Sequence, residues 1–119
     1  MDPKELKIPN ICFTLDDGKS EDSEEYKKQR IERGFDDTET FSLFITIANF
    51  ILPRLKRYKE ISKVHPVNMT FEEWNLILDK IIESFELITK PEYFGFGKDN
   101  PKIQEGIDLF AKYFKKLWW

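Results

Sequence analysis

The chain has 119 residues, 40% of them hydrophobic and 34% charged, and its formal net charge is −3. These values favour a soluble globular protein of one domain over a disordered or fibrous one. A chain with a small negative net charge is not expected to bind nucleic acid nonspecifically. The single cysteine, Cys12, excludes an intramolecular disulfide, and the single histidine, His65, excludes most zinc and histidine-based catalytic sites.

No apolar segment is long enough to span a bilayer. The longest apolar-rich run, residues 41–52, falls short of the roughly 20 residues that a transmembrane helix needs. The first residues lack an apolar run after a basic start, so no signal peptide is visible. We therefore expect a cytoplasmic protein without membrane contact.

The first 19 residues are predicted to form an extended arm. Pro3 and Pro9 interrupt helical periodicity, and apolar residues alternate with others at positions 11, 13 and 15. Because this is the sole strand-like run, no sheet is expected within one chain. The arm is predicted to pack across the helices.

Residues 20–33 are predicted to form a polar helix. Acidic side chains fill its first turn and basic side chains follow, an order that suits the helix dipole. Gly34 is placed to end the helix. Only Tyr26 and Ile31 are apolar, so the helix is expected to add little to the core and to present its charges to water.

Residues 36–62 are predicted to form the central helix of the fold, with Asp36 and Glu39 as its capping box. Apolar side chains surround it almost completely between residues 41 and 52. Such a helix is buried by several neighbours or by another subunit. Pro53 lacks a backbone N–H and crowds the preceding turn, so we expect a kink there, the alternative being two helices that meet at Leu52.

Two further helices are predicted, over residues 70–89 and 100–118. Thr70 and Glu73 form a capping box for the first, and Asn100 is a favourable N-cap for the second. Apolar residues repeat at helical spacing in both. The predicted fold class is therefore all-α, a compact single-domain bundle of about four helices with an N-terminal arm, covering residues 1–119.

The sequence offers no catalytic or metal-binding signature. Cys12 has no charged neighbour in the sequence, and His65 is the only imidazole that could activate it. The acidic pairs at residues 16–17 and 36–37 do not match a calcium loop, and no E-x-x-H pair suits a di-iron bundle. We expect neither an enzyme nor a cofactor or metal.

Basic and aromatic side chains close the central helix: Arg54, Lys56, Arg57, Tyr58 and Lys59. Two arginines three residues apart on a helix can face one anion, and their planar guanidinium groups suit phosphate. The lysines would add positive potential and the tyrosine could stack on a base. The alternative is that these residues form the solvated end of a core helix and pair with Glu60 and the acidic helices nearby.

The last residues are unusually aromatic, with Phe114, Trp118 and Trp119 close together. Chain ends are commonly polar and frayed, whereas large aromatic side chains favour docking into a groove. We interpret these three residues as an interface, with another copy of the chain as the expected partner. The protein is therefore expected to be a homo-oligomer.

Several segments between residues 30 and 118 carry a resemblance to a known group of proteins: GFDD at 34–37, FSL at 41–43, ILPRLK at 51–56, EEW at 72–74 and LFAKYF at 109–114. The chain resembles small bacteriophage and prophage proteins that have this pattern and no assigned activity. It departs from the pattern at Phe41, where the family has tryptophan, and the resemblance leaves out the arm. The resemblance implies a phage context and no catalytic role.

The phage context suggests two functional hypotheses. The first is a non-enzymatic, homo-oligomeric protein in the host cytoplasm that sequesters a small anionic, nucleotide-like ligand and so counters host defence signalling. Its ligand would bind the basic end of the central helix. The alternative is a protein–protein interaction module that inhibits or adapts a host or virion protein, with an exposed apolar surface around Trp118 and Trp119.

Overall fold

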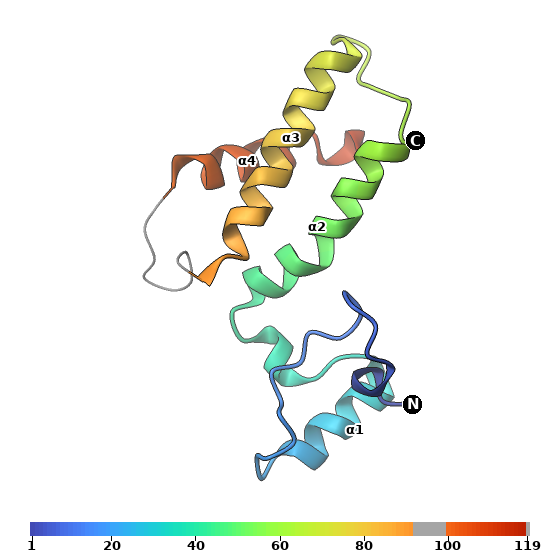
Figure 1. Ribbon diagram of the computed structural model, residues 1–119, viewed down its shortest axis with the longest axis vertical. Helices are drawn as coiled ribbons and strands as arrows, with labels where there is room; N and C mark the ends of the chain where they lie inside the picture. Colours follow the sequence, from blue (N-terminus) through green and yellow to red (C-terminus); the bar gives the residue numbers. More distant parts are fainter. Residues whose placement is uncertain (92–99, 119) are drawn as a thin grey trace. The chain divides into compact units, whose positions relative to one another are not determined.

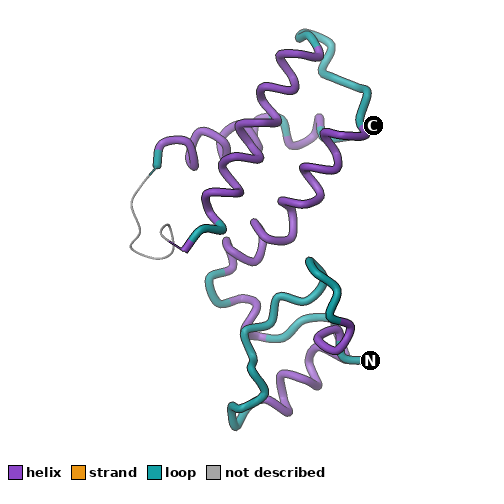
Figure 2. The backbone as a smooth tube through the Cα atoms, viewed as in Figure 1, coloured by secondary structure: helices purple, strands orange, loops and turns teal. Residues whose placement is uncertain are grey.

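The computed structural model describes residues 1–91 and 100–118, and within them it contains helices and loops but no strand (Figures 1 and 2). The all-α prediction is thereby confirmed for this part of the chain. The α-helices are α1 (Ser23–Arg33), α2 (Leu43–Ile61), α3 (Phe71–Ile88) and α4 (Pro101–Lys112). Short 3-10 helices cover Pro3–Leu6 (η1), Asp37–Thr40 (η2) and Phe114–Lys116 (η4).

Contacts along the chain group it into two compact units, Met1–Phe50 (unit 1) and Ile51–Trp119 (unit 2). Unit 1 contains the arm, α1, η2 and the first turns of α2. Unit 2 contains the rest of α2 together with α3 and α4. Across the residues that the structure describes, no helix combines the length and the apolar character needed to cross a membrane.

The core of unit 2 is built around α3. Buried apolar residues recur every three or four positions along this helix, as the sequence predicted: Trp74, Leu78, Ile81, Phe85 and Ile88. Leu55 of α2 is also buried. Phe110 of α4 packs edge-on against Phe85 with 5.2 Å between ring centroids, so α4 closes one side of this core.

The contact between α3 and α4 depends on a glycine. A Cβ atom at Gly106 would lie 2.1 Å from the Cβ of Ser84 and 2.7 Å from the carbonyl oxygen of Lys80. The Ser84 hydroxyl donates a hydrogen bond to the carbonyl of Ile103 at 2.6 Å. Only a residue without a side chain lets the two helices approach this closely.

Three predicted helix ends are confirmed. Thr70 caps α3 by accepting from the N–H of Glu73, whose side chain in turn accepts from the N–H of Thr70. The Asn100 side chain caps α4. Gly34 ends α1 with φ +88°, in the left-handed region that glycine adopts without strain.

The predicted start of the central helix is wrong. Asp36 and Glu39 do form a capping box, but it caps η2, and α2 begins only at Leu43. Ser42 lies between the two helices with φ +50°, a conformation that interrupts the helical hydrogen-bond ladder. The other bounds differ less: α1 begins at Ser23 rather than at residue 20, and α4 gives way to η4 after Lys112.

The helix α2 continues through Pro53, so the alternative of two helices meeting at Leu52 is excluded. The kink at this proline stays a prediction. The expectation that residues 41–52 form the buried centre of the bundle is wrong, because Ala48 is the only one of them that is buried. The central position belongs to α3, whose single apolar stripe has partners within unit 2.

Candidate functional site

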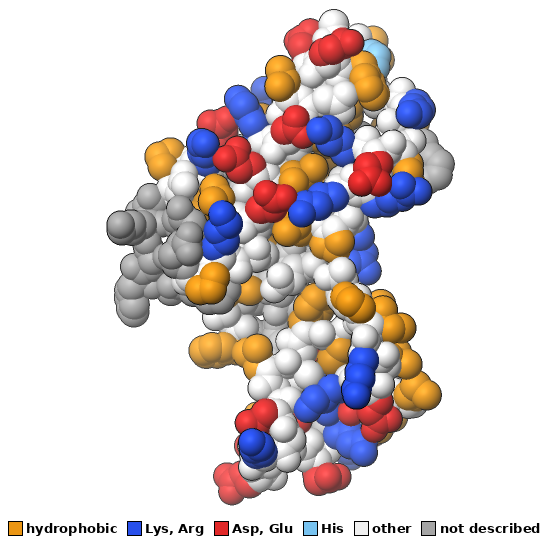
Figure 3. Space-filling model, viewed as in Figure 1, with side chains coloured by type: hydrophobic (Ala, Val, Ile, Leu, Met, Phe, Trp, Pro, Cys, Tyr) orange, Lys and Arg blue, Asp and Glu red, His pale blue; other side chains and the backbone are white. Residues whose placement is uncertain are grey.

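The predicted basic site lies in unit 2, where three of its cations are paired with acids. Lys56 lies 3.0 Å from a carboxylate oxygen of Glu86. Arg57 lies 3.0 Å from Glu60, and Lys59 contacts Asp79 of α3. Figure 3 shows the acidic and basic side chains interleaved over α2 and α3. These are the pairs expected if the cluster is the solvated end of a helix.

Lys56 and Lys59 line a hollow of about 400 Å³, and Glu60, Asp79 and Ile82 line the rest of it. Two lysines and two carboxylates give this hollow no net charge. An anion binding there would therefore compete with carboxylates that already hold the ammonium groups. Arg54 is exposed on the same helix, three residues before Arg57.

Tyr58 is connected to the last described residues of the chain. Its hydroxyl donates to the carbonyl of Trp118 at 3.0 Å, with the carbonyl of Lys116 at 3.4 Å. Tyr58, predicted as a ligand contact, and Trp118, predicted as an interface residue, are thus brought together through the backbone of Trp118. The side chains of Trp118 and Phe114 are exposed, whereas the third predicted interface residue, Trp119, lies outside the described residues.

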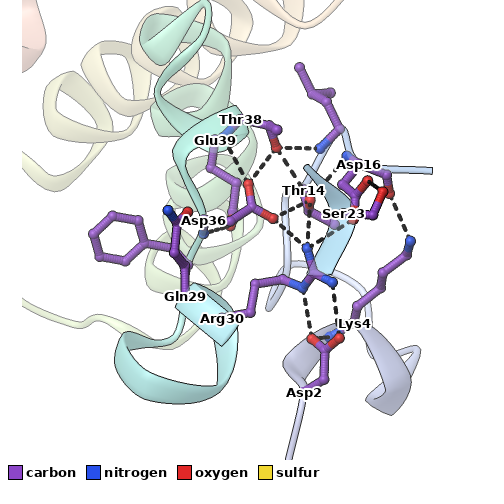
Figure 4. Close-up of polar contacts among 12 residues, drawn as sticks. Asp2, Lys4, Thr14, Asp16, Ser23, Gln29, Arg30, Asp36, Thr38 and Glu39 are labelled. Carbon is purple, nitrogen blue, oxygen red and sulfur yellow. Dashed lines mark hydrogen bonds and ion pairs between the residues drawn. The ribbon is translucent and has the colours of Figure 1, made fainter. Parts of the chain in front are cut away.

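Unit 1 is organised by a buried ion cluster around Arg30 of α1 (Figure 4). The guanidinium binds Asp2 through two nitrogens, at 2.8 and 3.0 Å. It also donates to Asp36 at 2.6 Å and to Asp16 at 3.4 Å. All four side chains are less than a tenth exposed. Arg30 therefore ties two positions of the arm to the segment that precedes η2.

The charges of this cluster stabilise one another. The hydrogen bonds from Arg30 hold the pKa of Asp2 below its ordinary value, and the bond from the Ser23 hydroxyl does most to lower the pKa of Asp16. Burial acts to raise the pKa of Asp36, but the hydrogen bonds that it accepts outweigh burial, so this pKa is lowered as well. All three aspartates are thus kept charged in the folded protein.

Hydroxyl and backbone groups extend the cluster into the arm. The Thr14 hydroxyl donates to Asp36, and the Thr38 hydroxyl accepts from the N–H of Leu15 at 2.8 Å. Glu39 accepts from the N–H of Phe13 at 2.9 Å. These bonds fix residues 13–15 against the stretch that leads into α2.

This cluster was missed from the sequence, because Arg30 lies in a run of charges that was expected to face water. A signal was present in the acidic surplus, since residues 1–50 carry 12 acidic and 7 basic side chains. Composition of this kind does not identify which single arginine the acids surround. The spacing of Asp2, Asp16 and Asp36 along the chain also gives no local motif.

An apolar groove of about 390 Å³ lies beside the fixed arm, entirely within unit 1. The arm contributes Ile11 and Phe13, and Phe35 follows α1. The helix α2 contributes Leu43, Thr46, Ile47 and Phe50 to the lining. The polar side chains of the lining belong to Glu39, Thr40 and Thr46. Each of them already makes a hydrogen bond within unit 1, so the groove offers few polar groups to a ligand.

Three exposed apolar residues of α2 line this groove, and two exposed phenylalanines of the same stretch lie outside the lining. We call these five residues the apolar face: Phe41, Leu43, Phe44, Ile47 and Phe50. Phe41 is 72% exposed and Phe44 50% exposed. No charged residue occurs from position 40 to position 53. Single exposed apolar residues are common on proteins, whereas a contiguous group is typical of an interaction surface.

Two kinds of reactive site, an activated thiol and a metal centre, are not found in the described residues. Burial raises the pKa of the half-buried Cys12 thiol, which disfavours the reactive thiolate. In the same part of the chain, no three His, Cys, Asp or Glu side chains are grouped so that they could hold a metal ion. The three aspartates of the buried cluster enclose the guanidinium of Arg30 instead.

Comparison with known proteins adds nothing to these observations: no family model, no curated protein and no solved structure matches the chain.

Proposed function

We propose that this protein is a non-enzymatic binding protein of the phage type that acts by protein–protein contact through the apolar face. The observation that carries the proposal is the run of exposed apolar residues from Phe41 to Phe50, beside a groove of about 390 Å³. The phage context rests on the sequence resemblance. A role in inhibiting or adapting a host or virion protein is part of the proposal.

The size of the apolar face supports protein contact over small-molecule binding. A phenylalanine offers roughly 150–250 Å² of surface. The exposed fractions of Phe41, Phe44 and Phe50 then correspond to about 250–420 Å² before any aliphatic residue is added. An apolar patch of a few hundred Å² on a monomer is often functional. Covering it with a partner is favourable, because removing apolar surface from water lowers the free energy.

The test is photo-crosslinking in cells that produce the protein. A photoreactive phenylalanine analogue replaces Phe44 in one variant and Leu76 in another. Leu76 is a matched control, because it is exposed on α3 but has charged neighbours. We expect one adduct of defined mass from position 44 and none from position 76. The absence of a discrete adduct at position 44, or the same adduct at both positions, would contradict the proposal.

A second candidate function is the binding of a small anionic, nucleotide-like ligand at the basic end of α2. The observation in its favour is that Lys56 and Lys59 open on one hollow of about 400 Å³. Arg54 and Arg57 are exposed three residues apart on the same helix, outside the lining of this hollow, and would hold phosphate. The ligand would have to displace the carboxylates that now pair with Lys56, Arg57 and Lys59.

A thermal-shift panel of mono- and dinucleotides tests this second candidate. A ligand present at 100 times its Kd would stabilise the folded state by about 2.7 kcal/mol, a shift that is readily measured. The shift should be lost in Arg54→Ala and in Lys59→Ala, and kept in Lys80→Ala, which removes a cation from α3. If no nucleotide shifts the melting temperature of the unmodified protein, the candidate is rejected.

A further inference from the structure

We propose that the apolar face binds a second copy of this chain, and that the two α2 helices pack antiparallel across a two-fold axis at Ile47. This inference rests on the proposed function, because both use the apolar face. It adds that a second copy covers the face when no other protein is bound, and it gives the register of that contact. A host or virion protein would displace the second copy from the same residues. The same patch on both copies would then form a closed dimer rather than an open chain.

The spacing of apolar residues along α2 suits such an axis. Phe44 and Phe50 lie three residues before and three residues after Ile47, about one helical turn in each direction. The three side chains are exposed to nearly the same extent, 50, 49 and 46%. In an antiparallel pair centred on Ile47, Phe44 of one copy meets Phe50 of the other, and the two isoleucines meet on the axis.

Self-contact at this face brings no like charges together. A two-fold axis places a residue next to its own copy only where that residue lies close to the axis, so a charged residue there would face an identical charge. No residue from 40 to 53 is charged. The Thr46 hydroxyl, which lies in the same stretch, already donates to Glu39 within its own chain and can be covered without losing that bond.

The predicted C-terminal interface suits a second copy less well. Phe114 and Trp118 are exposed, but Lys112, Lys115 and Lys116 lie among them. Pairing this surface with itself would gather several ammonium groups, which disfavours association. Among the exposed apolar positions of the described residues, the apolar face is therefore the best match for self-association.

The area of the face sets the expected affinity. Its phenylalanines offer about 250–420 Å², and Leu43, Ile47 and the neighbouring Phe35 and Ile11 add to this. The smallest stable specific interfaces take about 600 Å² from each partner. We therefore expect a weak dimer with a Kd on the order of micromolar or above, because some larger interfaces already have a Kd in the micromolar range.

The decisive experiment introduces a thiol on the proposed axis. Helices packed at about 8–10 Å, with Cα atoms about 2.3 Å from each helix axis, bring facing Cα atoms within reach of a disulfide. Ile47→Cys is made in a Cys12→Ala background and oxidised mildly. Leu76→Cys in the same background is the control. We expect Ile47→Cys to form a covalent dimer at least tenfold faster than Leu76→Cys.

Analytical ultracentrifugation of the unmodified protein provides the second measurement. Between about 5 and 500 µM, its average mass should rise towards that of a dimer. Phe44→Ser should shift this transition at least tenfold higher in concentration, while Leu76→Ser leaves it in place. Circular dichroism of Phe44→Ser should match that of the unmodified protein, because the side chain is already half exposed.

The outcomes separate the two proposals. A strict monomer at 500 µM, together with equal oxidation rates at positions 47 and 76, rejects the second copy as partner. If position 44 then still crosslinks to a foreign protein in cells, the proposed function stands and only this inference fails. A dimer that persists unchanged in Phe44→Ser places self-association elsewhere and also overturns the inference. If position 44 yields no adduct of either kind, the proposed function fails with it.

Discussion

Each of the two units encloses a different kind of side chain in its interior. In unit 1, the buried side chains are mostly charged, with Arg30 enclosed by Asp2, Asp16 and Asp36. In unit 2, the described core consists of apolar residues from α3 with Leu55 of α2. The contrast extends to the surface, because 12 of the 16 exposed large hydrophobic residues that the structure describes belong to unit 1.

This contrast shows that the two units use their apolar residues differently. Buried apolar area is the main stabilising contribution in most small domains. The part of unit 2 that the structure describes uses its apolar residues in this way, and four large ones are exposed there: Val67, Leu76, Phe114 and Trp118. Unit 1 encloses hydrogen-bonded charges instead, and Phe41, Phe44 and Ile47 are among the large hydrophobic residues that it leaves exposed.

Among the variants that test this difference between the units, Arg30→Ala is expected to change stability most. It leaves three carboxylates buried without their cation, and breaking a buried ion pair in this way costs about 3–5 kcal/mol. Hydrogen exchange read by mass spectrometry should show loss of protection throughout residues 1–50. Every tryptophan of the chain, at positions 74, 118 and 119, belongs to unit 2, so unfolding followed by tryptophan fluorescence should change little.

Arg33→Ala is the matched control for this experiment. Arg33 is also an arginine of α1, but its pair with Asp37 is exposed to solvent. Such pairs contribute about 0–1 kcal/mol. Equal loss of protection in both variants would show that burial of the Arg30 cluster is not what stabilises unit 1.

Acid should weaken the same cluster, with a smaller effect because protonated carboxyl groups can still accept hydrogen bonds. The folded-state pKa values of Asp2, Asp16 and Asp36 are lowered. Their contribution to stability is therefore fully present above the unfolded pKa of about 3.9 and is lost as the pH falls through the folded values. Exchange in unit 1 should accelerate below about pH 4, once corrected for its intrinsic pH dependence.

The apolar core of unit 2 can be tested at the closest approach of its helices. Gly106→Ala places a Cβ 2.1 Å from that of Ser84, which forces α3 and α4 apart. Overpacking of this kind costs about 1–3 kcal/mol. Unfolding followed by tryptophan fluorescence should show this loss of stability, whereas hydrogen exchange in residues 1–50 should stay unchanged. Gln104→Ala, at an exposed position of α4, should leave both readings unchanged.

The smallest effect is expected from the surface pairs of α2. Lys56→Ala removes the contact with Glu86, in which both side chains are about half exposed. We expect a loss of about 0–1 kcal/mol in fluorescence-monitored unfolding, and a smaller loss at high salt. A cost above about 2 kcal/mol would indicate that the basic end of α2 has a structural role that its exposure does not suggest.

The sequence predicted the elements of unit 2 better than those of unit 1, for a physical reason. The apolar stripe of α3 and the capping residues Thr70 and Asn100 are local patterns, and each is confirmed. In the buried cluster, Arg30 contacts residues up to 28 positions away in the sequence. No local spacing in the sequence indicates such a contact, so the sequence pattern places Arg30 on a solvated face.

The central helix shows a second limit of reasoning from local pattern. Its apolar residues correctly predicted a helix, but not whether they are covered by the same chain. Residues 41–50 are largely exposed, which leaves burial by another subunit as the remaining alternative from the sequence. The basic residues that follow were predicted either as a ligand site or as a solvated helix end, and their acidic partners agree with the second.

The close approach of Gly106 to Ser84 has a consequence for how distant relatives could be recognised. Two positions 22 residues apart must both carry very small side chains, and a larger residue at either one would separate the helices. Selection should therefore preserve smallness at the two positions together, even where the surrounding apolar residues exchange freely. A chain with no detectable overall similarity, but with this pair behind a Thr-x-x-Glu helix start, would be a candidate for the same helical pairing.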